Sequence, residues 1–402
     1  MIKPTFKYLF AAIIAVCFLL PAKAQQPAKG ELPYSDYYET KGGISNFLAA
    51  VAKKQATVAF LGGSITFNPG WRDMVTKYLK ETYPQTKFKF IAAGIPSLGS
   101  LPHAFRVKRD VLDSGKVDLL FLEAAVNDRA NGTDSLTQVR DLEGIIRHAK
   151  RSNLRMDIIM MSFADPEKND DYAKGKTPAE VFNHELVASH YNLPSINLAK
   201  EVHDKIQNKE FNWDADFKDL HPSPFGQKLY FDNIKSLLQK LAAKPVKKPA
   251  VKALSNPLNA ANFEHGNYYN ITNAKHDENW DIDKNWAPKD NLGTRPGFVN
   301  VPVLVTEKAG AELTLQFTGT AIGMGVVSGG DAGIVSYSID GSSYKKIDLY
   351  TAWSGGLHLP WYILFSGDLK KGRHVLKLKI ADKHNANSKG NACRIVYFMR
   401  NE

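Results

Sequence analysis

The sequence predicts an α/β domain built on a doubly wound parallel sheet, followed by an all-β sandwich with a jelly-roll-like arrangement. Three observations lead to this prediction. From residue 57 to residue 243, short apolar runs alternate with segments of helical periodicity. Residues 253–402 instead contain period-two segments with turn dipeptides and no long helical pattern. The run KPVKKPAVK, residues 244–252, lies between them and is typical of a stiff linker.

The first 24 residues have the layout of a secretory signal peptide. Lys3 and Lys7 precede an apolar run over residues 9–20, and Ala-Lys-Ala at residues 22–24 provides a cleavage site with small residues. The apolar run is shorter than the roughly 20 residues that a membrane span needs. We therefore expect export to the periplasm or out of the cell, without membrane insertion, and a first domain over residues 25–243.

Charge and cysteine content narrow the possible partners and stabilising bonds. The formal net charge of +11 could attract nucleic acid or anionic membranes, but the dense basic run is confined to the linker. An ordinary lysine-rich surface with no nucleic-acid partner is therefore expected. Cys17 lies in the signal peptide, which leaves Cys393 without a disulfide partner in the mature chain. Metal-ligand, phosphate-loop and dinucleotide patterns are absent, so we expect no metal and no cofactor.

The strands and helices of the first domain can be assigned in order. The predicted strands are TVAFLGG (57–63), FKFIAAG (88–94), VDLLFLEAAVND (117–128) and MDIIMMSF (156–163). Helical spacing predicts helices beginning at Trp71 and over 104–114, 135–151, 178–190 and 224–241. The third strand is nearly all apolar, as expected for a strand covered by helices on both faces. Ligands gather at the carboxyl ends of such strands, where Ser64, Gly94 and Asn127 lie.

The second domain, 253–402, contains four long stretches of alternating pattern. They cover residues 311–327, 333–350, 361–380 and 392–401, and Asp-Gly and Lys-Gly dipeptides mark turns within them. One segment, 348–365, is rich in aromatic and imidazole rings: Tyr350, Trp353, His358, Trp361 and Tyr362. These rings could fill the sandwich core or a domain interface, or Trp353 could stack on a sugar ring.

The strand ends of the first domain carry the groups that nucleophilic catalysis needs. A serine hydroxyl is a weak nucleophile that requires a nearby base and donors for the developing oxyanion. Ser64 follows the first strand, Gly94 ends the second and Asn127 ends the third. His221 lies in the segment WDADFKDLHPSPFGQ, just before the last helix. We expect these residues to meet at one edge of the sheet.

Four short blocks of this domain resemble those of the SGNH hydrolases. Gly-Ser-Ile-Thr at 63–66 is similar to their G-D-S-L block and Gly94 to their second block. Val-Asn-Asp at 126–128 is similar to G-x-N-D, and Asp-Leu-His-Pro at 219–222 to D-x-x-H. The resemblance implies a flavodoxin-like sheet, Ser64 as nucleophile and His221 as its base. It also implies an oxyanion hole made by the backbone N–H groups of Ser64 and Gly94 and the side-chain amide of Asn127.

Two positions depart from the pattern of the family. Ala125 stands where the family usually has glycine, which restricts the local backbone. Lys218 occupies the position three residues before His221, where an aspartate is expected to orient the imidazole. Asp219 is the favoured orienting acid. Asp216 and a main-chain carbonyl group are the alternatives.

Three further polar residues of the first domain have less specific patterns. Glu123 lies on the apolar third strand and is expected to be a buried carboxylate with a structural partner. His103 and Arg106 follow the second block and could line the pocket, although positions on the helix surface are expected for both.

The resemblance implies an ester hydrolase, and the remaining features suggest its substrate. Family members act on lipids, thioesters and acetylated sugars, so the fold alone does not define the substrate. Export, the lack of a long apolar lid and the appended sandwich favour an O-acetylesterase acting on a polysaccharide or oligosaccharide. The alternatives are a lipase or phospholipid acylhydrolase, an acyltransferase, and a glycan-binding protein without catalytic activity.

Overall fold

The computed structural model describes residues 30–243 and 253–402. Within them, Leu32–Glu402 form one compact unit. The predicted signal peptide, 1–24, and the predicted linker, 244–252, lie outside the described residues. No helix in the described part of the chain is long and apolar enough to cross a membrane.

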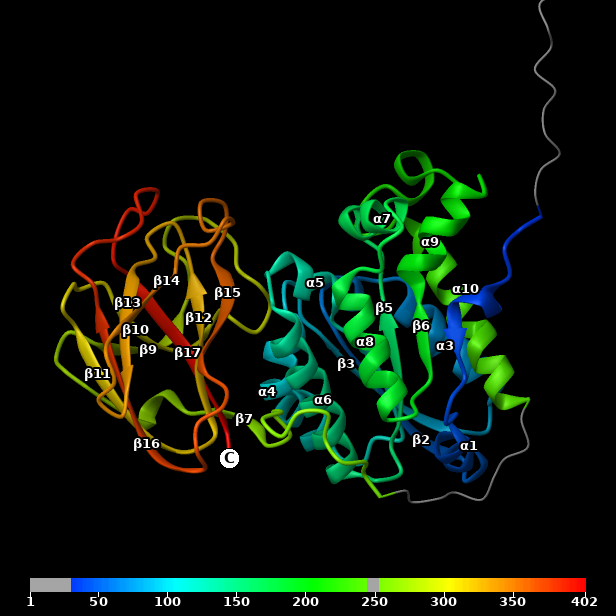
Figure 1. The fold of residues 1–402 in the computed structure, drawn as a ribbon, viewed down its shortest axis with the longest axis horizontal. Helices are drawn as coiled ribbons and strands as arrows, with labels where there is room; N and C mark the ends of the chain where they lie inside the picture. Colours follow the sequence, from blue (N-terminus) through cyan, green and yellow to red (C-terminus); the bar gives the residue numbers. More distant parts are fainter. Residues whose placement is uncertain (1–29, 244–252) are drawn as a thin grey trace, which may run out of the picture. The chain divides into compact units, whose positions relative to one another are not determined.

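A six-stranded sheet forms the centre of the first half of the chain (Figure 1). Its strand order is β1-β6-β5-β4-β2-β3, and all neighbours pair in parallel except β1, which is antiparallel to β6. The strands are β1 (Tyr38–Glu39), β2 (Gln55–Gly62), β3 (Lys87–Gly94), β4 (Leu119–Glu123), β5 (Asp157–Ser162) and β6 (Ser195–Asn197). The register pairs Gly62 with Gly94, so β2 and β3 end level with each other.

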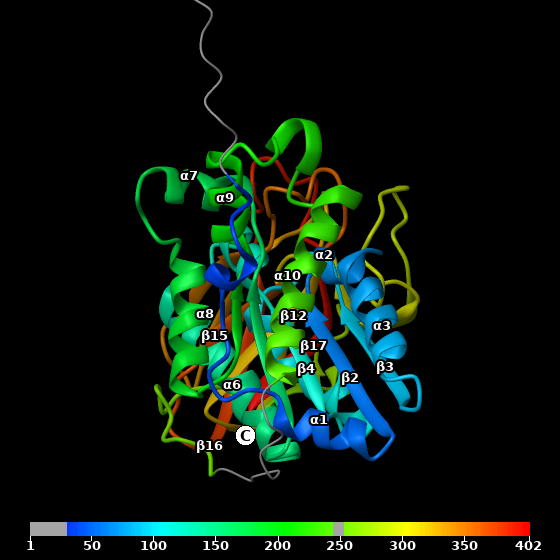
Figure 2. The same ribbon diagram turned by 90° about the vertical axis from the view of Figure 1, so that its right-hand side faces the viewer.

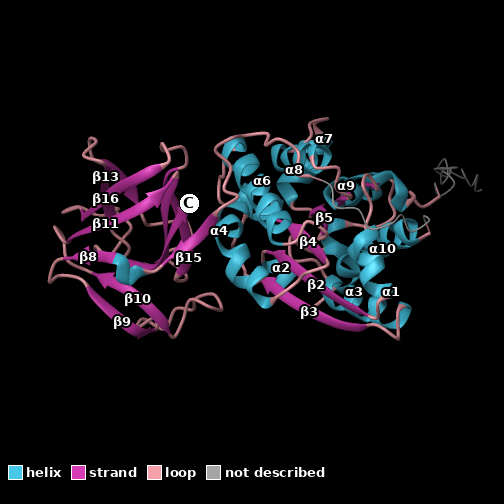
Figure 3. Ribbon diagram, turned by 90° about the horizontal axis from the view of Figure 1, so that it is seen from below, coloured by secondary structure: helices cyan, strands magenta, loops and turns pink. Residues whose placement is uncertain are grey.

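Helices cover both faces of this sheet. One hydrophobic cluster packs α1 (Ser45–Ala52), α3 (Trp71–Thr82), α9 (Leu198–Gln207) and α10 (Pro224–Ala242) against one face. A second cluster packs α4 (Ser100–Asp110), α6 (Ser135–Ser152) and the end of α8 (Ala179–His190) against the other. Figure 2 shows α3 and α10 in front of the strands, and Figure 3 shows α4 and α6 on the opposite side of the sheet from α3 and α10. The predicted doubly wound α/β fold is confirmed.

One prediction about the strand ends is wrong. The strand predicted over 117–128 ends at Glu123, because the Glu123 carboxylate accepts the Val126 N–H at 3.2 Å and turns the chain into α5 (Ala125–Ala130). Asn127 therefore lies in a helix rather than at a strand end. Ser64 is the first residue of a short helix, α2 (Ser64–Phe67). This helix was not predicted, because the helical spacing in the sequence begins only at Trp71. Another helix without a sequence prediction is α7 (Pro166–Ala173).

The second half of the chain is an antiparallel β-sandwich, as predicted. One sheet has the order β15-β12-β17-β10-β9, with β7 paired to β17, and the other has the order β14-β13-β16-β11-β8. The strands are β7 (Gly266–Tyr269), β8 (Ala274–His276), β9 (Asp281–Trp286), β10 (Val301–Thr306), β11 (Glu312–Gly319), β12 (Ala321–Ser328), β13 (Ile334–Ile339), β14 (Lys345–Asp348), β15 (Leu359–Ser366), β16 (Gly372–Ile380) and β17 (Cys393–Asn401). Alternation is clear on β11, where Leu313, Leu315 and Phe317 are buried between more exposed neighbours.

Helix α4 packs directly on the first sheet of the sandwich. The Arg109 guanidinium lies 4.7 Å from the ring centroid of Tyr268 and 4.9 Å from that of Tyr397. The rings of Phe105 and Phe263 lie 5.2 Å apart. Helix α4 follows β3 closely in the chain, so it begins near the carboxyl end of that strand. Its packing on the sandwich therefore brings loops of the sandwich close to the carboxyl ends of the parallel strands.

Candidate active site

Ser64 lies directly beyond the end of β2, where two glycines make room for its neighbours. A Cβ atom on Gly63 would lie 2.0 Å from Nδ2 of Asn127, and one on Gly62 would lie 2.3 Å from Oγ1 of Thr66. Neither distance is possible for a real side chain. The two glycines therefore allow the Asn127 amide and helix α2 to approach the strand end closely.

The loop before α10 brings His221 to Ser64. Nε2 of His221 lies 2.8 Å from Oγ of Ser64, which is a hydrogen-bond distance. The imidazole is about half exposed, with 47% of its side-chain surface accessible. A neutral imidazole at this distance can accept the serine proton, so the pair has the geometry of an activated nucleophile.

Asp219 contacts His221 differently from the orienting acid that was expected. Its Oδ1 lies 3.7 Å from Nδ1 of the ring, beyond hydrogen-bond distance, and accepts the main-chain N–H of His221 instead. Asp216 is directed elsewhere, because its carboxylate accepts the N–H of Asn212 at 2.8 Å. Within residues 30–243 and 253–402, Nδ1 of His221 has no hydrogen-bond partner, and this includes main-chain carbonyl groups.

An unusual backbone conformation at Lys218 accounts for this arrangement. Lys218 has φ +85° and ψ −62°, a tight turn that is strained for a residue with a side chain. The turn closes the single π-helical segment Trp213–Phe217 and reverses the chain immediately before Asp219. The carboxylate at 219 is thereby positioned to cap the peptide N–H of His221 rather than to reach its ring.

The predicted oxyanion donors are only partly brought together. Asn127 lines the same cavity as Ser64 and His221. Gly94 is not among the residues that line this cavity. A Cβ on Gly94 would lie 2.5 Å from the Phe67 nitrogen, so Gly94 packs against the backbone of α2. The chain reaches the cavity three residues later at Ser97, which has a φ of +72°.

Both halves of the chain line the cavity at Ser64, which has a volume of about 460 Å³. This size lies within the range of about 300–1,000 Å³ for small-molecule sites. The lining residues are Ser64, Phe67, Asn68, Pro96, Ser97, Val126, Asn127, Ala130, Asn131, Leu220 and His221 from the α/β half, and Thr294, Arg295, Pro296, Trp353 and Leu359 from the sandwich. The sequence analysis did not find Thr294–Pro296, because this segment has no periodicity or motif.

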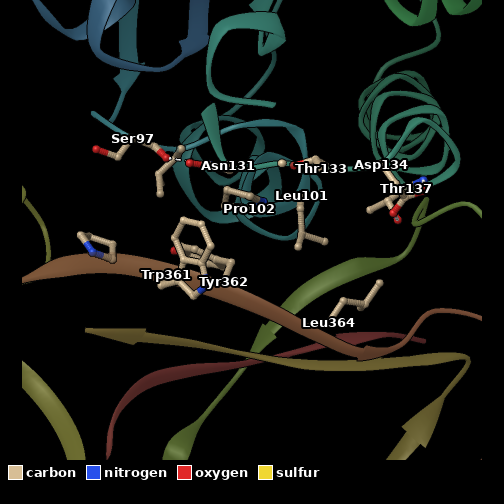
Figure 4. Close-up of a pocket in the computed structure, with 13 residues that line it drawn as sticks. Ser97, Leu101, Pro102, Asn131, Thr133, Asp134, Thr137, Trp361, Tyr362 and Leu364 are labelled. Carbon is tan, nitrogen blue, oxygen red and sulfur yellow. Dashed lines mark hydrogen bonds between the residues drawn. The ribbon is translucent and has the colours of Figure 1, made fainter. Parts of the chain in front are cut away.

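A second hollow of about 270 Å³ adjoins this cavity and shares Ser97 and Asn131 with it. Figure 4 shows Trp361, Tyr362 and Leu364 of β15 opposite Leu101 and Pro102 of α4. The rings of Trp361 and Trp353 lie 6.1 Å apart. The two hollows and these two indoles could therefore accommodate a ligand longer than a single small molecule.

The rings noted in the segment 348–365 have different environments. His358 is buried, with Nε2 2.9 Å from Oδ1 of Asp290, and the Tyr362 hydroxyl lies 2.6 Å from that of Tyr268. Trp353 is instead 40% exposed and lines the cavity. His358 and Tyr362 thus pack in the core or at the domain interface, whereas Trp353 is accessible to a ligand.

Arg106 supports the strand ends on which the site is built. Its side chain is fully buried, and Nη2 donates to the carbonyl oxygens of Ala93 at 2.7 Å and Gly62 at 3.2 Å. The expectation that Arg106 and His103 lie on the helix surface is wrong. His103 is also buried, and burial together with the Arg106 charge holds its pKa well below the usual value.

Buried carboxyl groups lie behind Asn127. The Ser100 hydroxyl lies 2.9 Å from Oδ1 of Asp128 and 3.0 Å from Oδ2 of Asp141. Burial raises the pKa of Asp128 to about 7, and burial together with the Asp128 charge raises the pKa of Asp141 well above its usual value. Burial also raises the pKa of Glu123 to about 7. These carboxyl groups are not among the residues that line the cavity, and Asp128 holds the start of α4 against α5 through the Ser100 N–H and hydroxyl.

No group of three or more His, Cys, Asp or Glu residues in the described part of the chain could hold a metal ion.

Comparison with known proteins finds a family model that matches part of the α/β half. Residues 60–229 match the model described as the GDSL-like Lipase/Acylhydrolase family. Over this segment the chain is similar to that family, and the matched segment contains all four of the blocks noted in the sequence. No curated protein matches the chain.

Solved structures match the chain over both of its halves. A two-domain esterase (CEX) active on acetylated mannans, co-crystallized with mannopentaose, has 20% sequence identity and a TM-score of 0.72. The match covers 91% of this chain and 97% of that chain. A second structure of that esterase matches with the same identity and TM-score and covers 98% of that chain. An acetyl xylan esterase, AlAXEase, covers 45% of this chain at 21% identity and a TM-score of 0.39. The first two likenesses show that the combined α/β and sandwich fold occurs elsewhere.

Proposed function

We propose that this protein is an exported serine esterase that removes O-acetyl or other short acyl groups from a polysaccharide or oligosaccharide. The observation that supports it most directly is the 2.8 Å distance between Nε2 of His221 and Oγ of Ser64, in a cavity that Trp353 also lines. Export rests on the N-terminal sequence.

In the proposed reaction, Ser64 and His221 act as nucleophile and base. Oγ of Ser64 attacks the acyl carbon while Nε2 of His221 accepts its proton. His221 then gives this proton to the departing sugar oxygen, which leaves an acyl group on Ser64. A water molecule, deprotonated by His221, attacks the acyl carbon of the acyl-enzyme. The bond to Oγ of Ser64 then breaks, His221 returns its proton to Oγ, and the carboxylic acid leaves.

The developing oxyanion needs donors that are in place before the reaction begins. We assign this role to the main-chain N–H of Ser64 and the side-chain amide of Asn127. Gly63 permits the close approach of that amide to the serine. The main-chain N–H of Gly94, expected as a third donor, stays a prediction, because the packing of Gly94 against α2 does not determine where this N–H points.

A glycan is the proposed substrate class because aromatic faces and a long hollow suit sugar rings. Trp353 is exposed at the cavity, and Trp361 lies next to it toward the second hollow. An indole face can stack on the apolar face of a sugar. The activity of the two-domain CEX esterase on acetylated mannans supports the same substrate class.

Labelling with a fluorophosphonate probe tests the nucleophile. The wild-type protein and a Ser97→Ala control, which alters another serine of the cavity, should be labelled at Ser64. Ser64→Ala should not be labelled and should release no acetate from acetylated oligosaccharides. Labelling that persists in Ser64→Ala would refute the assignment. Binding of glycan by an unlabelled wild-type protein would instead indicate a glycan-binding protein.

The acyl chain and the acceptor test the reaction class. We expect acetyl esters to react faster than long-chain esters, and free acetate to exceed transfer product when a sugar acceptor is supplied. Preference for long chains would indicate a lipase, and preferential transfer would indicate an acyltransferase.

A further inference from the structure

The cavity at Ser64 contains one permanently charged side chain. Among its sixteen lining residues, Arg295 is cationic, His221 is the other ionisable group, and none is an aspartate or glutamate. A cation in a partly buried cavity is normally paired with an acid or satisfied by hydrogen bonds. Its presence without a lining carboxylate suggests that the counter-charge comes from a ligand.

The hydrogen bonding of Arg295 leaves most of its donors available. Nε donates to Oγ of Ser97 at 3.1 Å. Among the described residues, the two terminal amino groups of the guanidinium have no hydrogen-bond or ion-pair partner. Arginine has five N–H donors in a planar arrangement, so four remain for a ligand. The side chain is half-buried.

The segment that carries Arg295 is anchored on both sides. Phe298 is buried in a hydrophobic cluster that includes Leu98 of the α/β half. On the other side, the His358 N–H donates to the Gly293 carbonyl at 2.9 Å, and Thr294 pairs with His358. The imidazole of His358 is itself held by Asp290. Arg295 is therefore presented by a fixed backbone, which lowers the entropic cost of binding an anion.

We propose that Arg295 makes the site select acylated glycans that carry a carboxylate close to the ester, as in uronic acid residues. The inference rests on the proposed function and names the substrate class of the same site. A carboxylate can accept two parallel hydrogen bonds from a guanidinium, and such charge-assisted bonds are roughly twice as strong as neutral ones. A neutral sugar offers only hydroxyl groups and gains no charge pairing. Loss of Lys3, Lys7 and Lys23 with the predicted signal peptide lowers the formal net charge from +11 to +8, which would still attract an acidic polysaccharide.

Arg295 could instead serve only as a tether between the two halves through Ser97. In that case its removal would affect all substrates alike. The two roles are separated by matched substrates, namely acetylated methyl uronosides and the corresponding acetylated methyl hexosides, which differ only in a carboxylate or a hydroxymethyl group at C6. Arg295→Gln removes the charge, and Arg295→Lys keeps it without the planar fork. Arg373→Gln, on the exposed surface of β16, is the control for net charge.

For the wild type and Arg373→Gln, we expect kcat/KM to be about tenfold higher for the uronoside than for the hexoside at low salt. Arg295→Gln should abolish this preference, mainly through a higher KM for the uronoside. Arg295→Lys should retain part of the preference. Equal rates on both substrates in the wild type, or an equal loss on both in Arg295→Gln, would overturn the inference.

Binding of the deacetylated methyl glycosides, measured by calorimetry, separates failure of this inference from failure of the proposed function. We expect the wild type to bind the uronoside more tightly than the hexoside, and Arg295→Gln to bind both equally. If no ester is cleaved and this difference is nevertheless found, the esterase assignment fails and the anion site stands. If esters are cleaved and no binding difference is found, the anion site is refuted and the esterase assignment stands.

Discussion

Nε2 of His221 lies 2.8 Å from Oγ of Ser64, although 157 positions separate the two residues in the chain. Ser64 is held by the end of β2 and the start of α2, whereas His221 is held by the loop that leads into α10. Helix α10 packs against α3, the helix that follows Ser64. The packing of these two helices therefore determines whether the nucleophile and its base meet.

Asp219 should contribute far less to catalysis than a buried triad aspartate. Its carboxylate lies 3.7 Å from Nδ1 of His221 and 68% of its side-chain surface is exposed, so solvent screens its charge. We expect Asp219→Asn to lower kcat about tenfold, in contrast to the roughly 10⁴-fold loss known for a buried triad aspartate. Asp219→Ala should be worse, because it also removes the acceptor for the His221 N–H.

Asp214→Asn is the matched control for Asp219, since Asp214 is an exposed carboxylate of the same segment. Its kcat should equal that of the wild type. A 10⁴-fold loss in Asp219→Asn would mean that the carboxylate reaches the imidazole during the reaction.

Arg106→Met should destabilise the fold because the buried guanidinium joins the ends of β2 and β3. The substitution removes its bonds to the Gly62 and Ala93 carbonyl oxygens and leaves Asp110 without the Nη1 donor at 2.8 Å. Asp110 keeps its ion pair with Nε of Arg109, so the main cost is the loss of buried hydrogen bonds from a charged donor, about 1.5–3 kcal/mol each. Urea unfolding should show this loss, and the remaining folded protein should have a reduced kcat.

Lys108→Met is the control for Arg106→Met. Lys108 lies on the same helix, but it is 47% exposed and pairs with Asp113 at the surface. Its cost should be below about 1 kcal/mol. Similar losses in both variants would contradict the assigned role of Arg106.

The buried carboxyl groups should make the protein less stable as the pH rises from about 4 to 7. Burial raises the folded-state pKa of Asp128 to about 7 and that of Asp141 well above its usual value, whereas unfolded aspartates titrate near 3.9. Between these values the folded state binds more protons than the unfolded state, so the free energy of unfolding falls with rising pH.

Asp141→Asn isolates one part of this pH dependence. The amide oxygen can still accept the Ser100 hydroxyl, but the side chain no longer titrates. We expect a smaller loss of unfolding free energy between pH 5 and pH 8 than in the wild type, measured by urea unfolding at both values. Asp113→Asn, at an exposed carboxyl, should follow the wild-type curve, and an unchanged slope in Asp141→Asn would argue against the buried pair.

Trp353→Ala should weaken the binding of oligosaccharides without affecting the acyl chemistry. The indole is exposed at the cavity, and the proposed acyl chemistry uses only Ser64, His221 and the oxyanion donors. We expect KM for an acetylated oligosaccharide to rise up to about tenfold, which corresponds to about 1.4 kcal/mol. Values of kcat for 4-nitrophenyl acetate should not change.

Trp353→Phe should bind the oligosaccharide more tightly than Trp353→Ala does, if stacking on a sugar ring provides the affinity. Tyr344→Ala, which truncates another exposed aromatic ring of the sandwich outside the cavity, should have no effect. A loss of kcat for 4-nitrophenyl acetate in Trp353→Ala would point to a structural role for the indole.

The sequence by itself determined the fold class, the resemblance to the SGNH hydrolases and three residues that line one cavity. Alternating apolar runs and helical spacing reflect which residues of one strand or helix are buried. Each such pattern lies within a short stretch of the chain and can be read from the sequence. The four blocks, in family order, were sufficient to single out Ser64, Asn127 and His221. The turn at Asp340-Gly341 was also predictable, and both residues have positive φ.

Only the tertiary structure decided how these residues are supported and what else surrounds them. The end of β4 depends on a hydrogen bond of Glu123, and the position of Asp219 depends on the turn at Lys218. Arg295 and Trp353 lie more than 200 positions after Ser64 in the chain. They reach the cavity because α4 packs on the sandwich. Such contacts join residues that share no sequence periodicity, so a local sequence pattern does not predict them.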